Sequence, residues 1–589
     1  MDIKKGFTSL SSKKSNDSFQ LLAVLSLFAV LLMAGCGESK TADDPNQPTA
    51  EIVCAPDNGG ITLPDGFCAS LVVDSLGLGD DHSARHIVVA PGGDIYVKTR
   101  SEEGGIAALR DTTGDFRADV IEYFGGRTPT GNGILWETGM AIHDGYLWAS
   151  NTTAVYRWPM PENGALVPEG ESEIVVDGFP EQRAHASKAF TFDESGNLYV
   201  VVATPTNACQ QEPRTPGSPG MMPCPELERR AGIWRFSATE TGQTYSPDAR
   251  YASGLRNVVG LDWNHTTDAL YVMQHGRDQL NTLWPDYYTV EENAKLPAES
   301  MYKVNEGDQF AWPYGYYNSF KDTLMLSPEY GGNGEISISE SEFAGEFEEP
   351  VIAFPGHWAP NDLLFYTGQQ FPERYRDGAF IAFMGSWNRA PLPQKGYKVV
   401  FVPFEDGQPA GDSETFADDF ANVDPIPDRG AAEYRPMGLA MGPDGALFIS
   451  DYKKGRIWRV VYAGEEAPEV EKTAAMSVDT AGAPPADTAV VSSSSLTGEA
   501  LFRQTACQTC HAVDPEAPAS TGPPLYDLYG SEVELGDGQT VTADEAYLRE
   551  SILDPNAKMV EGYMPVMPSY EGQLTEEEVS LLVSYITSL

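Results

Sequence analysis

The chain has 589 residues, which is enough for more than one domain with a filled core. It carries 86 acidic and 39 basic side chains, giving a formal net charge of −47. Nucleic-acid-binding proteins need basic surfaces, so this charge argues against that class. The acidic excess runs along the whole chain, which favours a solvated carboxylate surface suited to a saline habitat over a docking patch for a basic protein partner.

Residues 1–35 have the pattern of a secretory signal peptide. Lysines precede the apolar run LLAVLSLFAVLLMAG, which ends in small residues just before Cys36. LMAGC resembles the bacterial lipobox, which implies lipid attachment to Cys36. A plain transmembrane anchor is the alternative, although the run is short for a span. We expect a lipoprotein of the cell envelope that faces the periplasm or the exterior, with residues 36–53 as a tether.

The remaining cysteines fit an oxidising compartment. Cys54 and Cys68 flank one short loop, and Cys209 and Cys224 flank another. Both pairs suit disulfides.

A hairpin pattern recurs along residues 54–464. Each copy has an alternating strand, a turn rich in Gly, Asp or Asn, and a second strand. The copies are HIVVAPGGDIYVKT, GMAIHDGYLWASN, KAFTFDESGNLYVVVA, VVGLDWNHTTDALYVMQ, the less regular NDLLFYTG…DGAFIAFMGSW, and MGLAMGPDGALFISDY. Irregular hairpin repeats over this length indicate an all-β propeller, and six copies predict six blades.

The composition changes after the repeats. Residues 465–496 contain few large apolar residues and are predicted to form a disordered linker of roughly 30 Å span. Residues 497–589 are predicted to form a small, mostly helical domain. Its last segment, LTEEEVSLLVSYITSL, carries an apolar stripe of Leu581, Leu582, Tyr585 and Ile586.

The motif CQTCH, Cys507 to His511, is the attachment signal for one covalent haem c. Cys507 and Cys510 would bind the haem, and His511 would be an iron ligand. A zinc or thioredoxin-like site is the alternative. The motif, with TGPPLYDLYG and EGYMPVMPSY, resembles class I c-type cytochromes. By that resemblance Met567 is the second iron ligand, Pro523 lies behind the His511 ring, and Met564 is a packing residue.

Three stretches of the propeller carry candidate catalytic residues. His185 precedes an alternating strand in RAHASKAFTFDESGNLYV. Arg256 and Asn257 stand at a strand entrance in SGLRNVVGLDW, and Arg435 stands at another in EYRPMGLAM. A lone histidine before a strand is usually structural. Only the combination of His185 with Arg256, Asn257 and Arg435 indicates a site.

These stretches resemble the family of soluble glucose and sorbosone dehydrogenases, six-bladed propellers that bind pyrroloquinoline quinone (PQQ). The resemblance spans about residues 61–461 and includes ITLPDGF and FPERYRDGAFIAFMGSWNRAPLPQKGYKVV. It implies that His185 is the general base, that Arg256 and Asn257 contact quinone and substrate, and that Arg435 binds a quinone carboxylate. Arg389, in GSWNR, is the candidate for a second cationic contact.

The resemblance also implies an active-site calcium. The turn MQHGRD matches the family's calcium turn, so the main-chain oxygens of Gly276 and Arg277 would bind the ion. The residue types suit this chemistry. Arginine matches carboxylates in bidentate fashion, calcium seeks oxygen ligands, and a neutral imidazole can take a hydroxyl proton.

The chain departs from the family pattern at three positions. Thr204 stands where the sugar oxidases carry an aspartate that orients the histidine, with Asn207 nearby as a substitute. Lys188 stands in place of a glycine, and Met437 in place of a second arginine.

We therefore expect a quinohaemoprotein dehydrogenase that oxidises an aldose, sorbosone or a related alcohol or aldehyde and passes electrons through haem to a respiratory acceptor. Two alternatives stay open. The propeller could be a calcium-dependent lactonase or hydrolase, or a non-catalytic module that docks a redox partner for the cytochrome.

Overall fold

The computed structural model describes residues 54–77, 84–99, 105–125, 139–161, 164–345 and 347–464, and, nearer the C-terminus, 498, 501–502, 507, 511–513, 522–536, 538–553, 555, 557–563, 567 and 576–589. Cys36, Cys510, Met564 and the predicted linker lie outside the described residues. Within those ranges no helix has the length and apolar character needed to cross a bilayer.

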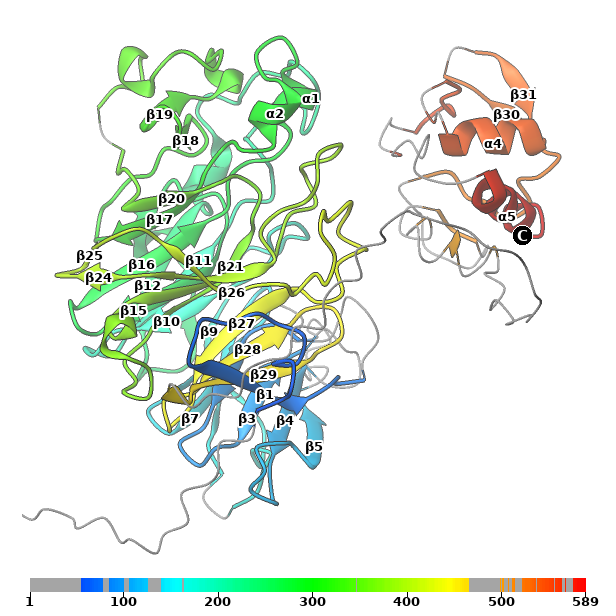
Figure 1. Cartoon of the computed structure of the whole chain (residues 1–589). Helices are drawn as coiled ribbons and strands as arrows, with labels where there is room; N and C mark the ends of the chain where they lie inside the picture. The colour runs from blue at the N-terminus through cyan, green and yellow to red at the C-terminus, as the bar shows by residue number, and fades with distance from the viewer. Residues whose placement is uncertain are drawn as a thin grey trace, which may run out of the picture. The chain divides into compact units, whose positions relative to one another are not determined.

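Six sheets make up the larger part of the chain, as the six hairpin repeats predict (Figure 1). The first five contain, in turn, β2 Ile87–Val89, β3 Ile95–Lys98, β4 Ile106–Arg110 and β5 Val120–Phe124; β6 Met140–His143, β7 Tyr146–Ser150, β8 Val155–Pro159, β9 Glu173–Asp177 and the short parallel β13 Gln243–Thr244; β10 Phe190–Phe192, β11 Asn197–Val202, β12 Gly232–Ser237 and β14 Arg250–Ser253; β15 Val258–Asn264, β16 Ala269–Gln274, β17 Glu299–Val304 and β20 Ile352–Phe354; and β21 Pro360–Phe365, β22 Ala379–Phe383, β23 Lys398–Val402 and β26 Glu414–Ala417.

The sixth sheet joins the two ends of this region. It contains β27 Pro436–Met441, β28 Leu447–Asp451 and β29 Ile457–Tyr462, with β1 Phe67–Val73 paired to β29. Phe67 lies opposite Tyr462 and Ala69 opposite Val460. The earliest strand thus completes the last sheet and closes the ring, a pairing that the hairpin repeats do not predict.

Each sequence repeat forms the first two strands of a sheet. In GMAIHDGYLWASN the repeat becomes β6 and β7, and Asp144 and Gly145 of the turn have φ of 49° and 77°, the conformation that Asp-Gly favours between paired strands. The first strands of neighbouring sheets contact one another, including β10 with β15, β15 with β21, β21 with β27, and β27 with β2. The prediction of a six-bladed β-propeller is confirmed, with the first strand of each blade innermost.

Two buried aspartates connect neighbouring first strands. Asp262 of β15 accepts a hydrogen bond from the main-chain nitrogen of Phe365 in β21, at 2.8 Å. Asp362 of β21 accepts one from Leu439 in β27, also at 2.8 Å. Burial raises the pKa of each carboxyl to about 7. These bonds fix the inner strands against one another around the channel.

Loops between the strands carry smaller elements. The segment between β16 and β20 contains α1 Leu280–Leu283, α2 Val290–Asn293, β18 Gly315–Asn318 and β19 Thr323–Leu326 (Figure 1), and β24 Phe404–Glu405 pairs with β25 Gln408–Pro409 in the fifth blade. Short 3-10 turns cover Pro225–Glu228, Pro247–Ala249, Pro328–Tyr330, Ile338–Glu340 and Glu373–Tyr375. Both predicted disulfides, Cys54–Cys68 and Cys209–Cys224, are present.

The C-terminal region has its own apolar core. It contains β30 Glu532–Glu534, β31 Thr540–Thr542, α4 Glu545–Leu553 and α5 Glu576–Ile586. Leu582 and Ile586 of the predicted stripe are buried with Leu548 and Ile552 of α4. The helices agree with the predicted class, and the hairpin of β30 and β31 is an addition that the sequence pattern does not indicate.

Candidate functional site

His185 lies on the segment that leads into β10. Its Nδ1 is 2.7 Å from the main-chain oxygen of Thr204. Because a carbonyl oxygen only accepts, Nδ1 carries the proton and the lone pair of the neutral ring is on Nε2. Burial and the nearby Arg256 lower the pKa of His185 to about 3. The ring is therefore neutral and held in one tautomer at neutral pH.

Thr204 orients this ring with its backbone. The hydroxyl of Thr204 instead donates to the carbonyl oxygen of Thr206, at 2.8 Å. The suggestion that Asn207 substitutes for the missing aspartate is wrong, because its amide is engaged elsewhere. Its Oδ1 accepts from the main-chain nitrogen of Asp278 at 2.8 Å, and its Nδ2 donates to the Asp278 carbonyl at 2.9 Å.

Arg256 is buried at the entrance to β15. Its Nε donates to the Asn207 carbonyl at 3.1 Å, its Nη1 to the Gly276 carbonyl at 2.9 Å, and its Nη2 to Asp278 Oδ2 at 3.1 Å. The adjacent Asn257 accepts from the His275 nitrogen through its main-chain oxygen. The side-chain Oδ1 of Asn257 is buried without a hydrogen-bond partner. A bound hydroxyl or amide donor would satisfy that atom.

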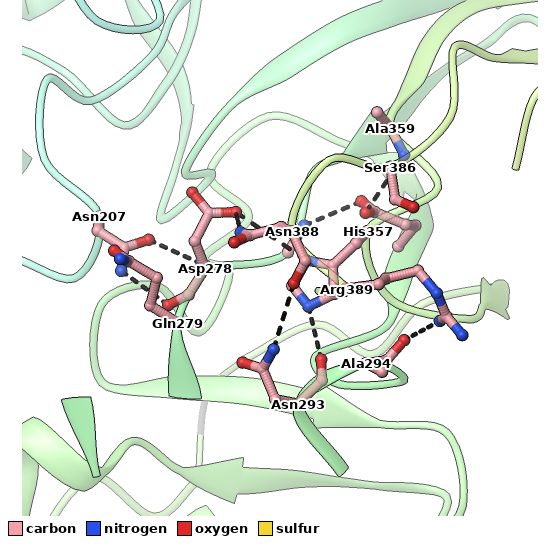
Figure 2. A network of polar contacts seen from close by, with 12 residues as sticks. Asn207, Asp278, Gln279, Asn293, Ala294, His357, Ala359, Ser386, Asn388 and Arg389 are labelled. Atoms are coloured by element: carbon pink, nitrogen blue, oxygen red, sulfur yellow. Dashed lines mark hydrogen bonds and ion pairs between the residues drawn. The ribbon is translucent and has the colours of Figure 1, made fainter. Parts of the chain in front are cut away.

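Asp278 is the polar centre of the cluster, and sequence reasoning missed it. Figure 2 shows it between Asn207 and Asn388, whose Nδ2 lies 2.5 Å from Asp278 Oδ1. His357 Nδ1 is 4.0 Å from the same oxygen. Although burial alone would raise it, Arg256 and His357 hold the pKa of Asp278 well below its usual range. The signal that could have found this residue was its place in the HGRD turn.

The two residues expected to bind calcium lie beside this aspartate. The nitrogen of Gly276 donates to Glu299 Oε2 at 3.0 Å, and burial raises the pKa of Glu299 to about 8. The Arg277 guanidinium pairs with the buried Glu329. A small pocket borders Arg256, Gly276 and Arg277.

The two remaining arginines come from the fifth and sixth blades. Arg389 donates from Nε to the Pro393 carbonyl at 3.0 Å and from Nη1 to the Ala294 carbonyl (Figure 2), and neither bond involves His185. Arg435 is buried and donates to the carbonyl oxygens of Met384 at 3.0 Å and Gly385 at 2.9 Å.

Two protein families match this chain, one over the propeller and one over the C-terminal region. The model of the TrAA12-like family matches residues 61–463, and that of the cytochrome c family matches residues 495–589. The chain belongs to the TrAA12-like family. Its propeller is joined to a cytochrome c domain, and this combination supports an oxidoreductase whose cytochrome domain implies haem c.

Solved structures share the fold of the TrAA12-like propeller. A family AA12 protein of Trichoderma reesei, in an iodide structure, is 18% identical with a TM-score of 0.53, over 69% of this chain and 98% of that one. The holo PQQ domain of a pyranose dehydrogenase from Coprinopsis cinerea is 17% identical with a TM-score of 0.51. The match covers 68% of this chain and 97% of that domain. An uncharacterised protein of Borreliella burgdorferi is 27% identical over 214 residues, 36% of this chain and 48% of the relative. The chain thus spans about half the length of that curated relative.

The residues of the TrAA12-like propeller fit a quinone and a calcium ion. Buried Arg256 and Arg435 suit the carboxylates of a tricarboxylic quinone, and the unpartnered Oδ1 of Asn257 suits a ligand donor. Across the described ranges no cluster of three or more His, Cys, Asp or Glu side chains could hold a metal. Calcium would instead use main-chain oxygens at Gly276 and Arg277 beside the ionised Asp278, which are oxygen ligands of the kind it prefers.

The residues of the cytochrome c domain fit a haem iron. His511 Nδ1 is 2.7 Å from the Pro523 carbonyl oxygen, and the His511 nitrogen donates to the Cys507 carbonyl at 3.0 Å. Burial lowers the pKa of His511, so its ring is neutral with the lone pair on Nε2. Such a hydrogen bond is the usual way in which a protein orients a histidine ligand. Met567 is partly buried.

Proposed function

We propose that this protein is an extracytoplasmic, lipid-anchored quinohaemoprotein dehydrogenase that oxidises an aldose, sorbosone or a related alcohol or hydrated aldehyde. The observation that carries the proposal is the neutral His185 ring, oriented by Thr204 at 2.7 Å and placed near Arg256. Membership of the TrAA12-like family and the cytochrome c match support it.

Oxidation of a carbinol removes one proton and one hydride from the substrate. When bound, PQQ with calcium would supply the hydride acceptor. The covalent haem would supply a one-electron carrier toward a respiratory acceptor. His185 takes the hydroxyl proton on Nε2, because Nδ1 is committed to the Thr204 carbonyl. Arg256 and Arg435 bind carboxylates, and Asn257 accepts a hydrogen bond through Oδ1.

Arg256 also links the base to the ion site. It donates to the Gly276 carbonyl and to Asp278, while its positive charge helps to lower the pKa of His185. One guanidinium therefore keeps the base unprotonated and orders the turn whose main-chain oxygens would bind calcium. The arginine and histidine set favours this function over metal-dependent hydrolysis, because it supplies carboxylate binding and a base.

The test uses full-length protein with haem attached. PQQ and calcium are added, and haem reduction is followed while aldoses, sorbosone and simple alcohols are supplied in turn. Reduction that needs both additions and is lost in His185→Ala, but not in the control His265→Ala at a half-exposed position, is the expected result. If no substrate reduces the haem and no quinone binds, the propeller is a hydrolytic or docking module and the haem receives electrons from another protein.

A further inference from the structure

The main chain of His185, the proposed base, has an unusual conformation. Its φ of 48° lies in the left-handed region, which residues other than glycine seldom adopt, and the residue lies in a turn before β10. A conformation of this kind persists only where the surrounding structure holds it. The contacts that hold the main chain of His185 therefore also decide where its ring lies.

The side chain of Gln182 makes such contacts. Its Nε2 donates to the His185 carbonyl at 2.8 Å and to the Ala184 carbonyl at 3.1 Å. The same Nε2 lies 3.1 Å from the carbonyl oxygen of Ala203, on the segment that follows β11. Ala203 directly precedes Thr204, whose carbonyl accepts the bond from His185 Nδ1. One amide group thus joins the main chain of the base to the main chain that orients its ring.

This amide extends the pairing between the first two strands of the third blade. Main-chain pairing of β10 with β11 continues to Val201, whose nitrogen donates to the Ala189 carbonyl at 2.9 Å. Ala203 lies two residues further along, and there the Gln182 side chain supplies the link. The segment that carries the base is therefore tied to its neighbour by a side chain.

Arg230 fixes the direction in which the Gln182 amide faces. Its Nε donates to Gln182 Oε1 at 3.0 Å. Because a guanidinium only donates and a carbonyl only accepts, the amide oxygen must face Arg230 and the amide nitrogen must face the three main-chain carbonyls. Gln182 is also buried, with an exposed fraction of 9%. The amide is thereby held in a single orientation.

Further hydrogen bonds connect Arg230 back to Thr204. The main-chain nitrogen of Arg230 donates to the Glu226 carbonyl at 2.8 Å, and the Thr206 hydroxyl donates to Glu226 Oε1 at 2.5 Å. The carbonyl of Thr206 accepts from the Thr204 hydroxyl at 2.8 Å. The contacts close into a ring of six residues, namely Gln182, Arg230, Glu226, Thr206, Thr204 and His185. The base is thus held through its main chain by Gln182 and through its imidazole by Thr204.

We propose that Gln182 is a positioning residue for the catalytic base, which keeps the left-handed main chain of His185 in place and so holds Nδ1 against the Thr204 carbonyl. Gln182 acts through His185 and moves no proton itself. Without the amide, the left-handed conformation loses three hydrogen bonds that support it, and Nε2 no longer keeps one position relative to the substrate. The inference rests on the proposed function, because it gives Gln182 a role in the same proton transfer.

The test compares Gln182→Met with the control Gln243→Met in full-length, haem-bound protein. Gln243 is a matched control, because its Nε2 also donates to two main-chain carbonyls, those of Ser237 at 2.7 Å and Glu240 at 2.9 Å. Ser237 pairs with Asn197 beside the hairpin turn of β10 and β11, at the far end of these strands from His185.

The assay supplies PQQ, calcium and whichever of glucose, sorbosone or ethanol reduces the wild-type haem fastest. In Gln182→Met we expect kcat for haem reduction to fall about ten- to a hundredfold, while KM and the affinity for PQQ stay within about twofold of the wild-type values. In Gln243→Met all three quantities should stay within about twofold.

A double variant separates positioning of the base from a merely structural role. In the His185→Asn background, Gln182→Met should change the rate by less than about twofold, because no base is left to position. An equal loss in both backgrounds would overturn the inference. Crystal structures without cofactor give a second measure. In Gln182→Met the bond from His185 Nδ1 to the Thr204 carbonyl should be broken, or φ of His185 should leave the left-handed region, and an unchanged His185 would overturn the inference.

Thermal unfolding shows whether Gln182→Met is folded. If it is not, Arg230→Met, at a partly exposed position, takes its place, since it leaves the amide but removes the bond that orients it. This variant should lower kcat about three- to tenfold, as expected for one hydrogen bond, and should have no further effect in the His185→Asn background. Wild-type kcat in the folded variant would overturn the inference and leave the proposed function standing. Absence of substrate-dependent haem reduction in the wild-type protein would overturn both.

Discussion

Thr204 fixes the tautomer of His185 with its main-chain oxygen, 2.7 Å from Nδ1, and not with its side chain. The bond places the lone pair on Nε2, which is what a general base requires. An aspartate at this position would bring a negative charge to the ring, whereas a carbonyl brings only a dipole. The ring is therefore oriented while its pKa stays low.

The first prediction concerns the side chain of Thr204. Thr204→Val keeps the carbonyl and removes only the hydroxyl bond to Thr206, which is worth about 1 kcal/mol. We expect kcat/KM for haem reduction to stay within about fivefold of the wild-type value. A loss of several orders of magnitude would mean that the hydroxyl itself takes part in orienting the base.

The second prediction concerns the base. His185→Asn removes Nε2 but retains a polar group, so we expect the rate of haem reduction by substrate to fall about 10²- to 10⁴-fold, the usual contribution of a general base. Affinity for PQQ should stay close to that of the wild-type protein. Stopped-flow absorbance measures the first quantity and fluorescence titration the second. An unchanged rate would exclude His185 as the base.

The third prediction is a pH dependence. Because the pKa of His185 is lowered to about 3, the base stays deprotonated from pH 7.5 down to about pH 5, and kcat/KM should not fall over that range through its protonation. The profile is measured by the initial rate of haem reduction. A decline with an apparent pKa near 6.5 would show that the ring titrates like an exposed histidine.

The same shift predicts an effect on stability. The folded pKa lies below the unfolded value of 6.5, so the unfolded chain takes up the proton first. The contribution of neutral His185 is complete above pH 6.5 and is lost as the pH falls toward 3, at about 1.4 kcal/mol per pH unit. The difference in free energy of unfolding between wild type and His185→Asn, measured in urea at several pH values, should follow this slope.

The fourth prediction concerns the buried ion pair of Arg256 and Asp278. Asp278→Asn leaves the guanidinium buried without its counter-charge, so the free energy of unfolding should fall by about 3–5 kcal/mol. Glu306→Gln, at the exposed pair with Arg235, is the control and should cost less than about 1 kcal/mol. Equal losses in the two variants would mean that the central pair contributes no more than a surface contact.

The fifth prediction distinguishes the two methionines near the C-terminus. Met567→Leu should abolish the sulfur-to-iron absorption band of the oxidised haem and lower its reduction potential, because a thioether ligand raises that potential. Met564→Leu should preserve both. The opposite pattern would assign the iron ligand to Met564.

The hairpin repeats predicted the blades because strand alternation and turn chemistry are local. Asp144 and Gly145 adopt the left-handed turn that their sequence suggests. The closure of the ring was not predictable in this way, since β1 and β29 pair across almost the whole propeller. The same limit applies to Asn207 and Asp278, which follow strands of the third and fourth blades and contact each other.

The sequence by itself determined the chemistry that the chain can carry. CQTCH specifies haem attachment, and His185, Arg256 and Arg435 are residue types suited to a base and to carboxylate binding. Only the tertiary structure decided which groups act together. It assigned the orientation of His185 to a main-chain oxygen, made Asp278 the partner of Arg256, and placed Arg389 against the carbonyl oxygens of Ala294 and Pro393. The physical reason is that a propeller brings the starts of six distant strands to one channel mouth, where burial and charge depend on neighbours from other blades.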